Sequence, residues 1–113
     1  MTRTFIQTEE FTHRWDDMGF SDDDLRALEQ EIMEKPDRFP VMKGTGGLRK
    51  ARISKNNSGK SSSARVCYVD FIVAETVYLI TVYEKKDKDN LSKAERNEVK
   101  KYIEAIKRSL GGE

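Results

Sequence analysis

The chain has 113 residues, of which 36% are hydrophobic and 36% charged, and its 21 basic residues nearly balance 20 acidic ones. This length predicts a single domain over residues 1–113 with a core of its own. No apolar run approaches the roughly 20 residues of a membrane helix, and no signal peptide is recognisable, so we expect a cytoplasmic protein. The single cysteine cannot form an internal disulfide, and no spacing of cysteine and histidine resembles a zinc site. We therefore expect neither a metal nor a cofactor.

The N-terminal third predicts a strand followed by two helices. Residues 3–8 are mostly β-branched or aromatic, which suits a short strand. Phe11, Trp15 and Met18 recur at helical spacing, and Gly19 ends that helix. Ser21 is a good N-cap for a second helix, which Pro36 stops. The buried stripe of this second helix is expected to be Leu25, Leu28, Ile32 and Met33.

Three strands and a final helix are predicted in the remainder. Residues 48–53 form a strand with Ala51 and Ile53 facing a core. Residues 65–73 and 76–83, joined through Ala74 and Glu75, are apolar on both faces and should be central. Ser92 and Glu95 make a capping box for the last helix, whose apolar face is expected to be Val99, Ile103, Ile106 and Leu110.

This order of elements defines the expected fold class. A strand, two helices, three strands and a helix predict an α+β domain with an antiparallel sheet of about four strands, two N-terminal helices and one C-terminal helix.

Charge is distributed unevenly along the chain. Residues 1–42 carry a net charge of −6, and residues 66–113 balance to zero. The segment between them holds no acidic residue and seven basic ones: Lys43, Arg49, Lys50, Arg52, Lys55, Lys60 and Arg65. Several clustered cations favour a polyanion, because they replace its condensed counterions. The alternative, a solvated basic loop without a partner, stays open.

Strand alternation brings some of these cations together. Lys50 and Arg52 project from one side of their strand, Arg65 begins the next strand, and Tyr83, Lys85 and Lys86 end the one after. We expect the cations to face solvent in one groove. Such a groove suits RNA cleavage, because fixed cations stabilise the negatively charged phosphorane that forms when a 2′-hydroxyl attacks the adjacent phosphate. Cations that lie close together also lower one another's pKa, so a lysine in this groove could act as a general base or acid. Binding of nucleic acid without catalysis is an equal alternative.

Three other side chains are expected to be structural. His13 lies in the acidic N-terminal part and is interpreted as structural or exposed. Cys67 lies inside an apolar strand and is interpreted as a small core residue. Trp15 shares its helical face with other large apolar side chains, so we interpret it as a core anchor.

Four blocks of sequence resemble a known family. They are Gly44-Thr45-Gly46-Gly47-Leu48-Arg49-Lys50-Ala51-Arg52, Ala64-Arg65-Val66-Cys67-Tyr68, Leu79-Ile80-Thr81-Val82-Tyr83-Glu84-Lys85 and Asp89-Asn90-Leu91-Ser92. Their order and spacing, from about residue 40 to residue 107, resemble the HigB-like branch of the RelE/ParE toxin superfamily. The shared order of strands and helices supports the resemblance.

The resemblance implies a bacterial type II toxin, a ribosome-dependent endoribonuclease that cleaves mRNA and inhibits translation. It implies a cognate helix-turn-helix antitoxin as partner, the ribosome and mRNA as targets, and contact with operator DNA only through the antitoxin. The catalytic residues carried over are Lys50, Arg52, Arg65, Tyr83 and Lys85, and the RNA-binding residues are Lys43, Arg49, Lys55, Lys60 and Lys86. In the last helix Tyr102 is the only aromatic side chain, and its spacing predicts burial.

Two other classes of protein remain as alternatives. A ParE-like toxin acts on DNA gyrase, but such relatives tend to lack the cationic set. A non-catalytic RNA-binding module such as a double-stranded-RNA-binding domain places lysines at the start of its final helix. Here residues 92–96 are mixed in sign, which argues against that module.

Overall fold

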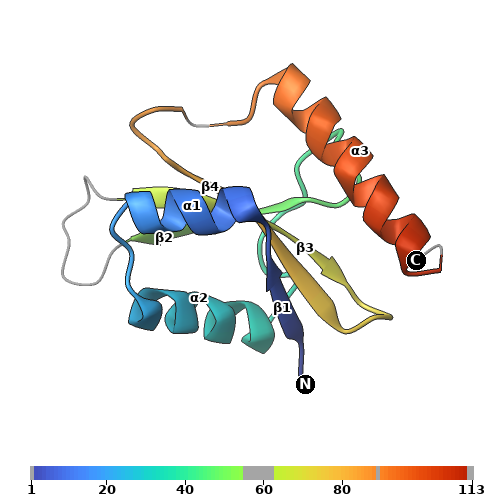
Figure 1. Ribbon diagram of the computed structural model, residues 1–113, viewed down its shortest axis with the longest axis horizontal. Helices are drawn as coiled ribbons and strands as arrows, with labels where there is room; N and C mark the ends of the chain where they lie inside the picture. Colours follow the sequence, from blue (N-terminus) through green and yellow to red (C-terminus); the bar gives the residue numbers. More distant parts are fainter. Residues whose placement is uncertain (1, 55–62, 89, 112–113) are drawn as a thin grey trace.

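A computed structural model describes residues 2–54, 63–88 and 90–111 (Figure 1). The strands are β1 (Thr4–Gln7), β2 (Arg49–Ser54), β3 (Ser63–Phe71) and β4 (Thr76–Glu84). The helices are α1 (Glu9–Asp17), α2 (Asp22–Glu34) and α3 (Lys93–Ser109). The predicted α+β class and order of elements are confirmed. Across these ranges no helix combines the length and the apolar character needed to cross a membrane.

The four strands form one sheet in the order β1-β4-β3-β2. The pairs β2–β3 and β3–β4 are antiparallel, whereas β1 runs parallel to β4, with Thr4 opposite Thr76. The sheet is therefore mixed, and its antiparallel pairs predominate as predicted. A parallel neighbour needs a long connection, and most of the chain separates β1 from β4. The prediction that β3 and β4 are central is confirmed.

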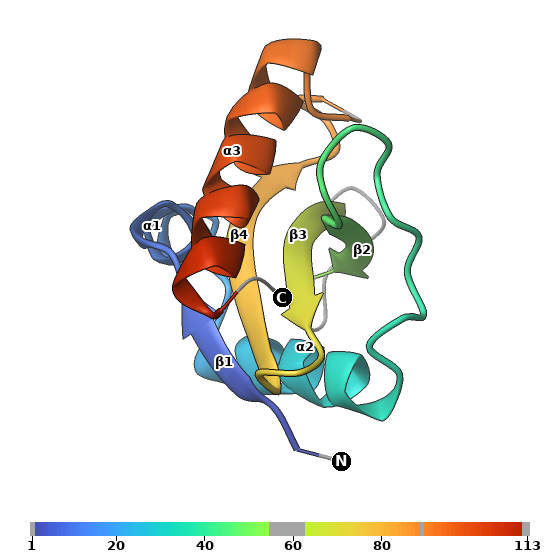
Figure 2. The same ribbon diagram turned by 90° about the vertical axis from the view of Figure 1, so that its right-hand side faces the viewer.

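Helices cover both faces of the sheet (Figure 2). Helices α1 and α2 pack on one face through Phe11, Trp15, Leu28 and Ile32, and Ala51 and Ile53 face this core as predicted. Helix α3 packs on the other face. The side chains of that second core are Leu48, Cys67, Val69, Phe71, Ile80, Tyr83, Leu91, Ile103 and Ile106.

The connection between β3 and β4 is longer than predicted. Residues 72–75 form the turn, and Ile72 and Val73, which were expected to continue the strand, are 69% and 84% exposed. The Glu75 amide donates to the Ile72 carbonyl at 3.1 Å, and Glu75 has φ +50°. A two-residue hairpin favours glycine or asparagine at its centre, which this segment lacks, so the chain closes over four residues.

Polar caps define the helix ends. The predicted N-cap Ser21 and the predicted capping box at Ser92 are confirmed: the Ser21 and Ser92 side chains accept from the amides of Asp24 and Glu95 at 3.1 Å, and Ser21 with Asp24 forms a second capping box that was not predicted. The N-cap of α1, Thr8, was not predicted; its hydroxyl accepts from the Phe11 amide and donates to the Ile80 carbonyl at 2.6 Å, which ties α1 to β4.

The expected burial of Tyr102 is wrong, because the side chain is 44% exposed. Helix α3 buries Ile103 and Ile106, and Leu110, also expected on the apolar face, is 36% exposed. A helix resting on a sheet covers only a narrow stripe of its surface, so the residue next to that stripe stays partly in solvent.

Trp15 is a core anchor, as predicted. It is 3% exposed and stacks between Phe11 and Phe20, with ring centroids 5.3 and 4.2 Å away. Its indole nitrogen has no hydrogen-bond partner among the described residues. A buried donor without a partner costs about 1–3 kcal/mol.

Trp15→Phe removes that buried donor together with part of the ring. We expect the free energy of unfolding to fall by less than about 1 kcal/mol, because relief of the orphaned donor offsets the lost packing. The matched comparison is Phe11→Ala, which leaves a cavity beside the same ring and should cost about 3–5 kcal/mol. Urea unfolding measures both. Equal losses would contradict an orphaned donor at Trp15.

Candidate active site

The predicted catalytic residues lie on one face of the sheet, where β2, β3 and β4 run side by side. Arg65 is directly opposite Arg52 of β2 and directly opposite Tyr83 of β4. Two residues along the strands on either side of this row of opposed residues lie Lys50 and Lys85. Lys50 is opposite Cys67, and the Lys85 amide donates to the Ser63 carbonyl at 3.3 Å. Opposed residues project to the same side of an antiparallel pair, as do residues two apart. The structure thus brings all five onto the face that α3 partly covers.

Exposure divides these five residues into two groups. Arg52 and Lys85 are exposed and Lys50 is half-buried. Arg65 and Tyr83 are each only 3% exposed. The expectation that Arg65 faces solvent in a groove is therefore wrong. Arg65 lies on the central strand β3, between β2 and β4, and its guanidinium donates to the Ala64 carbonyl at 3.5 Å.

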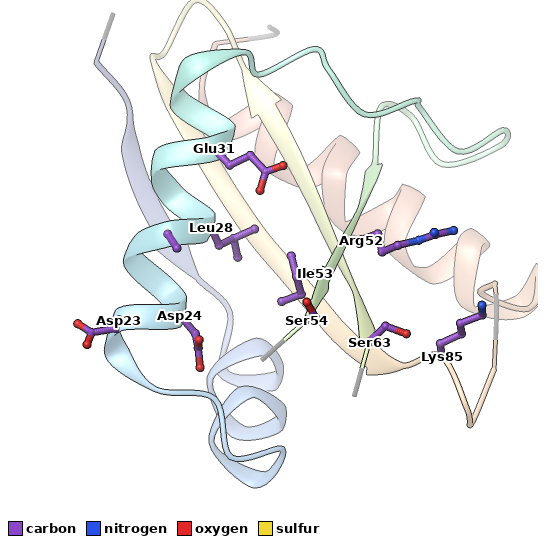
Figure 3. A pocket seen from close by; sticks show the side chains of 10 residues that line it. Asp23, Asp24, Leu28, Glu31, Arg52, Ile53, Ser54, Ser63 and Lys85 are labelled. Atoms are coloured by element: carbon purple, nitrogen blue, oxygen red, sulfur yellow. The ribbon is translucent and has the colours of Figure 1, made fainter. Parts of the chain in front are cut away.

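A cleft of about 820 Å³ opens beside the exposed pair. Figure 3 shows Arg52, Ser63 and Lys85 pointing away from α2, while Ile53 and Leu28 lie between the sheet and that helix. The wall formed by α2 carries Asp23, Asp24 and Glu31. The cleft therefore has a basic side and an acidic side with apolar groups between them, and only the basic side suits a phosphate.

Lys50 is held by the segment that follows β4. Its ammonium donates to the Asn90 side-chain carbonyl at 2.5 Å. Asn90 is exposed and was not predicted as a site residue, although it stands in one of the four blocks that carry the family resemblance. This contact fixes the position of the Lys50 ammonium beside the segment that follows β4.

A lysine lies over the ring of Tyr83. The Lys88 ammonium lies 5.1 Å from the centre of the Tyr83 ring and is paired with the Glu95 carboxylate at 2.5 Å. This hydrogen bond from Lys88 is the main cause that lowers the pKa of Glu95. Lys88 was missed from the sequence, because nothing in the charged segment around it distinguishes it from its neighbours.

Cys67 is inert, as predicted. Burial raises the pKa of its thiol to about 12, an effect that a hydrogen bond from Tyr83 and the charge of Lys50 only partly oppose. The side chain is completely buried. A thiol that keeps its proton is a poor nucleophile, so Cys67 serves the core beneath the site.

The residues predicted to bind RNA are scattered. The Arg49 guanidinium donates to the carbonyls of Phe39 at 2.6 Å and Asp37 at 3.3 Å, so it braces the segment before β2. Lys43 is exposed on that segment, and exposed Lys86 pairs with Glu84 at 3.2 Å. Lys55 and Lys60 lie outside the described residues. His13 is exposed on α1, in agreement with the prediction.

Solved structures share this fold. The chain is similar to a mutant of the E. coli toxin RelE in the free state, with 25% identity over 96% of this chain and 98% of that chain and a TM-score of 0.57. The isolated E. coli RelE toxin matches at 20% identity over 96% and 99%, with a TM-score of 0.57. The toxin–antitoxin complex of E. coli RelBE matches at 19% identity over 74% and 96%, with a TM-score of 0.58.

The family is shown by the sequence match. Residues 3–110 match the profile of the family described as the RelE toxin of the RelE/RelB toxin–antitoxin system, which is nearly the entire chain. This match agrees with the confirmed order of strands and helices and with the similarity to E. coli RelE. The chain belongs to the RelE toxin family.

Proposed function

We propose that residues 1–113 form one toxin domain of the HigB-like branch, a ribosome-dependent endoribonuclease that cleaves mRNA and thereby inhibits translation. The observation that carries the proposal is the row of Arg52, Arg65 and Tyr83 across three neighbouring strands, with Lys50 and Lys85 in the adjacent rows. Binding of a phosphate explains why four cations lie together on one face of a small sheet.

In this proposal the exposed cations contact the scissile phosphate. The 2′-hydroxyl loses its proton and attacks the adjacent phosphorus; the bond from phosphorus to the 5′-oxygen of the next nucleotide then breaks, and this leaving oxygen takes up a proton. The phosphorane formed on the way carries negative charge on its oxygens, which Arg52 and Lys85 stabilise, while Lys50 is oriented by Asn90. Arg65 and Tyr83 act from beneath this surface. A buried guanidinium is less screened by water than an exposed one, so its positive charge still reaches the phosphate.

RNA contacts beyond the scissile phosphate are assigned to Lys43, Arg49, Lys55, Lys60 and Lys86. Among them Arg49 contributes mainly by holding the segment before β2 in place.

The partners proposed for this chain are a cognate antitoxin and the ribosome with its message. The E. coli RelBE complex, which has the same fold, supports the antitoxin. We propose a helix-turn-helix antitoxin, with operator DNA contacted only through it, and action in the cytoplasm. Co-expression with the product of the adjacent gene should then abolish toxicity.

Activity is expected to require the ribosome. The site offers cations but no well-positioned general base, so the ribosome must hold the message in the geometry for in-line attack. Such positioning can lower the barrier by several kcal/mol. Purified protein should leave naked RNA nearly intact and cut the same message in a translating system, as mapping of transcript ends will show.

A parallel assay of DNA supercoiling by gyrase separates this proposal from the ParE-like alternative. Gyrase should be unaffected by the purified toxin. Rapid cleavage of free RNA, or inhibition of gyrase without cleavage of message, would contradict the proposal.

A further inference from the structure

One flank of helix α3 carries a row of basic side chains. At 3.6 residues per turn, four cations of this helix fall within an arc of about 60° beside its buried stripe. They are Lys93, Arg96, Lys100 and Lys107. Lys93 and Lys100 are exposed, and Arg96 and Lys107 are half-buried. At 1.5 Å per residue this basic row runs for about 21 Å along the helix.

The fold separates the basic row from the acidic residues of the helix. Glu95 lies on the other flank, where its carboxylate pairs with Lys88 and accepts from the Ser92 amide. Glu98 lies on the far side of the helix, and Glu104 borders the row. No ion pair in the described part of the chain joins a carboxylate to any cation of the row, whereas the arginine of α1 and that of α2 each pair with a carboxylate of their own helix. The mixed signs of residues 92–96 are therefore sorted onto two flanks.

The loop of residues 43–47 extends this basic surface. A Cβ at Gly46 would lie 3.6 Å from Lys100 Cγ and 3.8 Å from Ile103 Cγ2, so the loop lies directly against the helix. The Lys107 ammonium donates to the Gly46 carbonyl at 3.2 Å. In both Figure 1 and Figure 2 the loop runs beside α3. Lys43, which is exposed on the same loop, adds one more cation to this side of the molecule.

We propose that the basic row and the loop of residues 43–47 form a second RNA site, which binds the phosphate backbone of a double-helical RNA segment. Several fixed cations gain affinity for a polyanion by releasing its condensed counterions. The site adjoins the proposed cleavage site, because α3 begins three residues after Asn90, which holds Lys50. A structured RNA can therefore dock on α3 while a single strand occupies the face of the sheet. Only the identity of the duplex as RNA rather than DNA rests on the proposed function.

The side chains of this surface favour a duplex over a single strand or a protein. Single-stranded RNA is held largely by bases that stack on aromatic side chains, whereas a double helix is contacted through its phosphates and 2′-hydroxyls. The basic row contains no aromatic residue, and Tyr102, the only aromatic residue of α3, lies on the other flank. A protein partner would bury apolar groups at the centre of its interface, and the row offers none. A straight row of cations on a rigid helix instead suits the regular backbone of a duplex.

Binding of a short labelled RNA duplex to the purified chain tests this site, with oligouridine of the same number of phosphates as the comparison. Fluorescence anisotropy should show about tenfold tighter binding of the duplex. Lys93→Ala combined with Lys100→Ala removes two exposed cations of the basic row, so it should lower the slope of log affinity against log salt by about 2. The Lys85→Ala variant should bind the duplex as the unsubstituted chain does, because Lys85 belongs to the cleavage site.

A matched control removes two exposed cations from the opposite side of the same helix. Lys101→Ala combined with Arg108→Ala changes the net charge equally, but neither residue lies in the basic row, so the salt slope should stay the same. All four substituted side chains are exposed, so the substitutions should change stability little, and urea unfolding checks that both double variants are folded.

The inference is overturned if the duplex does not bind, if oligouridine binds as tightly, or if the control lowers the salt slope as much as the variant of the basic row. It is equally overturned if Lys85→Ala abolishes duplex binding, since the duplex would then occupy the cleavage site. These measurements use neither ribosome nor message. A chain that binds the duplex through α3 but never cuts mRNA would therefore contradict the proposed function and leave the second site intact.

Discussion

Lys85→Ala is expected to slow cleavage of translated message by about 10²–10³-fold, the effect of removing one preorganised donor from a charged transition state. The side chain is exposed beside Arg52 in the cleft, so its loss should change the free energy of unfolding by no more than about 0.5 kcal/mol. Quantitative mapping of transcript ends over time gives the rate, and urea unfolding gives the stability.

A matched control separates the specific effect of Lys85 from the general effect of losing one exposed positive charge. Lys101→Ala removes one exposed lysine from α3, away from the proposed site, and should leave both the cleavage rate and the stability unchanged. Full activity of Lys85→Ala, or equal losses in both variants, would eliminate the proposed site.

Arg65→Ala is expected to reduce cleavage at least as strongly as Lys85→Ala, but with a loss of stability as well. The side chain is 3% exposed, so alanine leaves unfilled space and removes hydrogen bonds within the sheet. Arg65→Lys should restore part of the rate, because an ammonium keeps the charge but cannot donate as a planar fork. The folded fraction must be measured at the assay temperature before the two rates are compared.

Asp70→Asn is expected to cause a large loss of stability. The Arg3 guanidinium donates to both oxygens of the Asp70 carboxylate, at 2.8 and 3.3 Å, and the two side chains are 6% and 8% exposed. Removing one charge of a buried pair costs about 3–5 kcal/mol, because the other remains buried without compensation. For a domain of this size the melting temperature should fall by roughly 10–20 °C.

The exposed pair between Arg38 and Glu31, with 53% and 38% exposed side chains, provides the control. Glu31→Gln should change stability by less than about 1 kcal/mol, because water screens an exposed pair. A double-mutant cycle between Arg3 and Asp70 isolates their coupling. A coupling near zero would show that the ion pair between Arg3, which precedes β1, and Asp70 of β3 contributes nothing to stability.

The helices and the central strands were predictable because their signals are local. Serines at helix starts, apolar side chains at helical spacing and strands without a polar face all act through neighbours in the chain, and their placement was confirmed. Alternation along β2 likewise gave the correct faces for Ala51 and Ile53. The family resemblance depended on the same kind of information, the order and spacing of short blocks.

Tertiary structure alone decided how these elements meet. Alternation does not give register, so the alignment of Arg52 with Arg65 and Tyr83 required the pairing of three strands. The burial of Arg65 follows from the neighbours of β3, and the contact of Lys88 with Tyr83 from the path of the segment after β4. The parallel pairing of β1 joins segments some 70 residues apart. Each of these contacts joins residues distant in the chain, and the free energy that selects them comes from burying whole faces together rather than from any local preference.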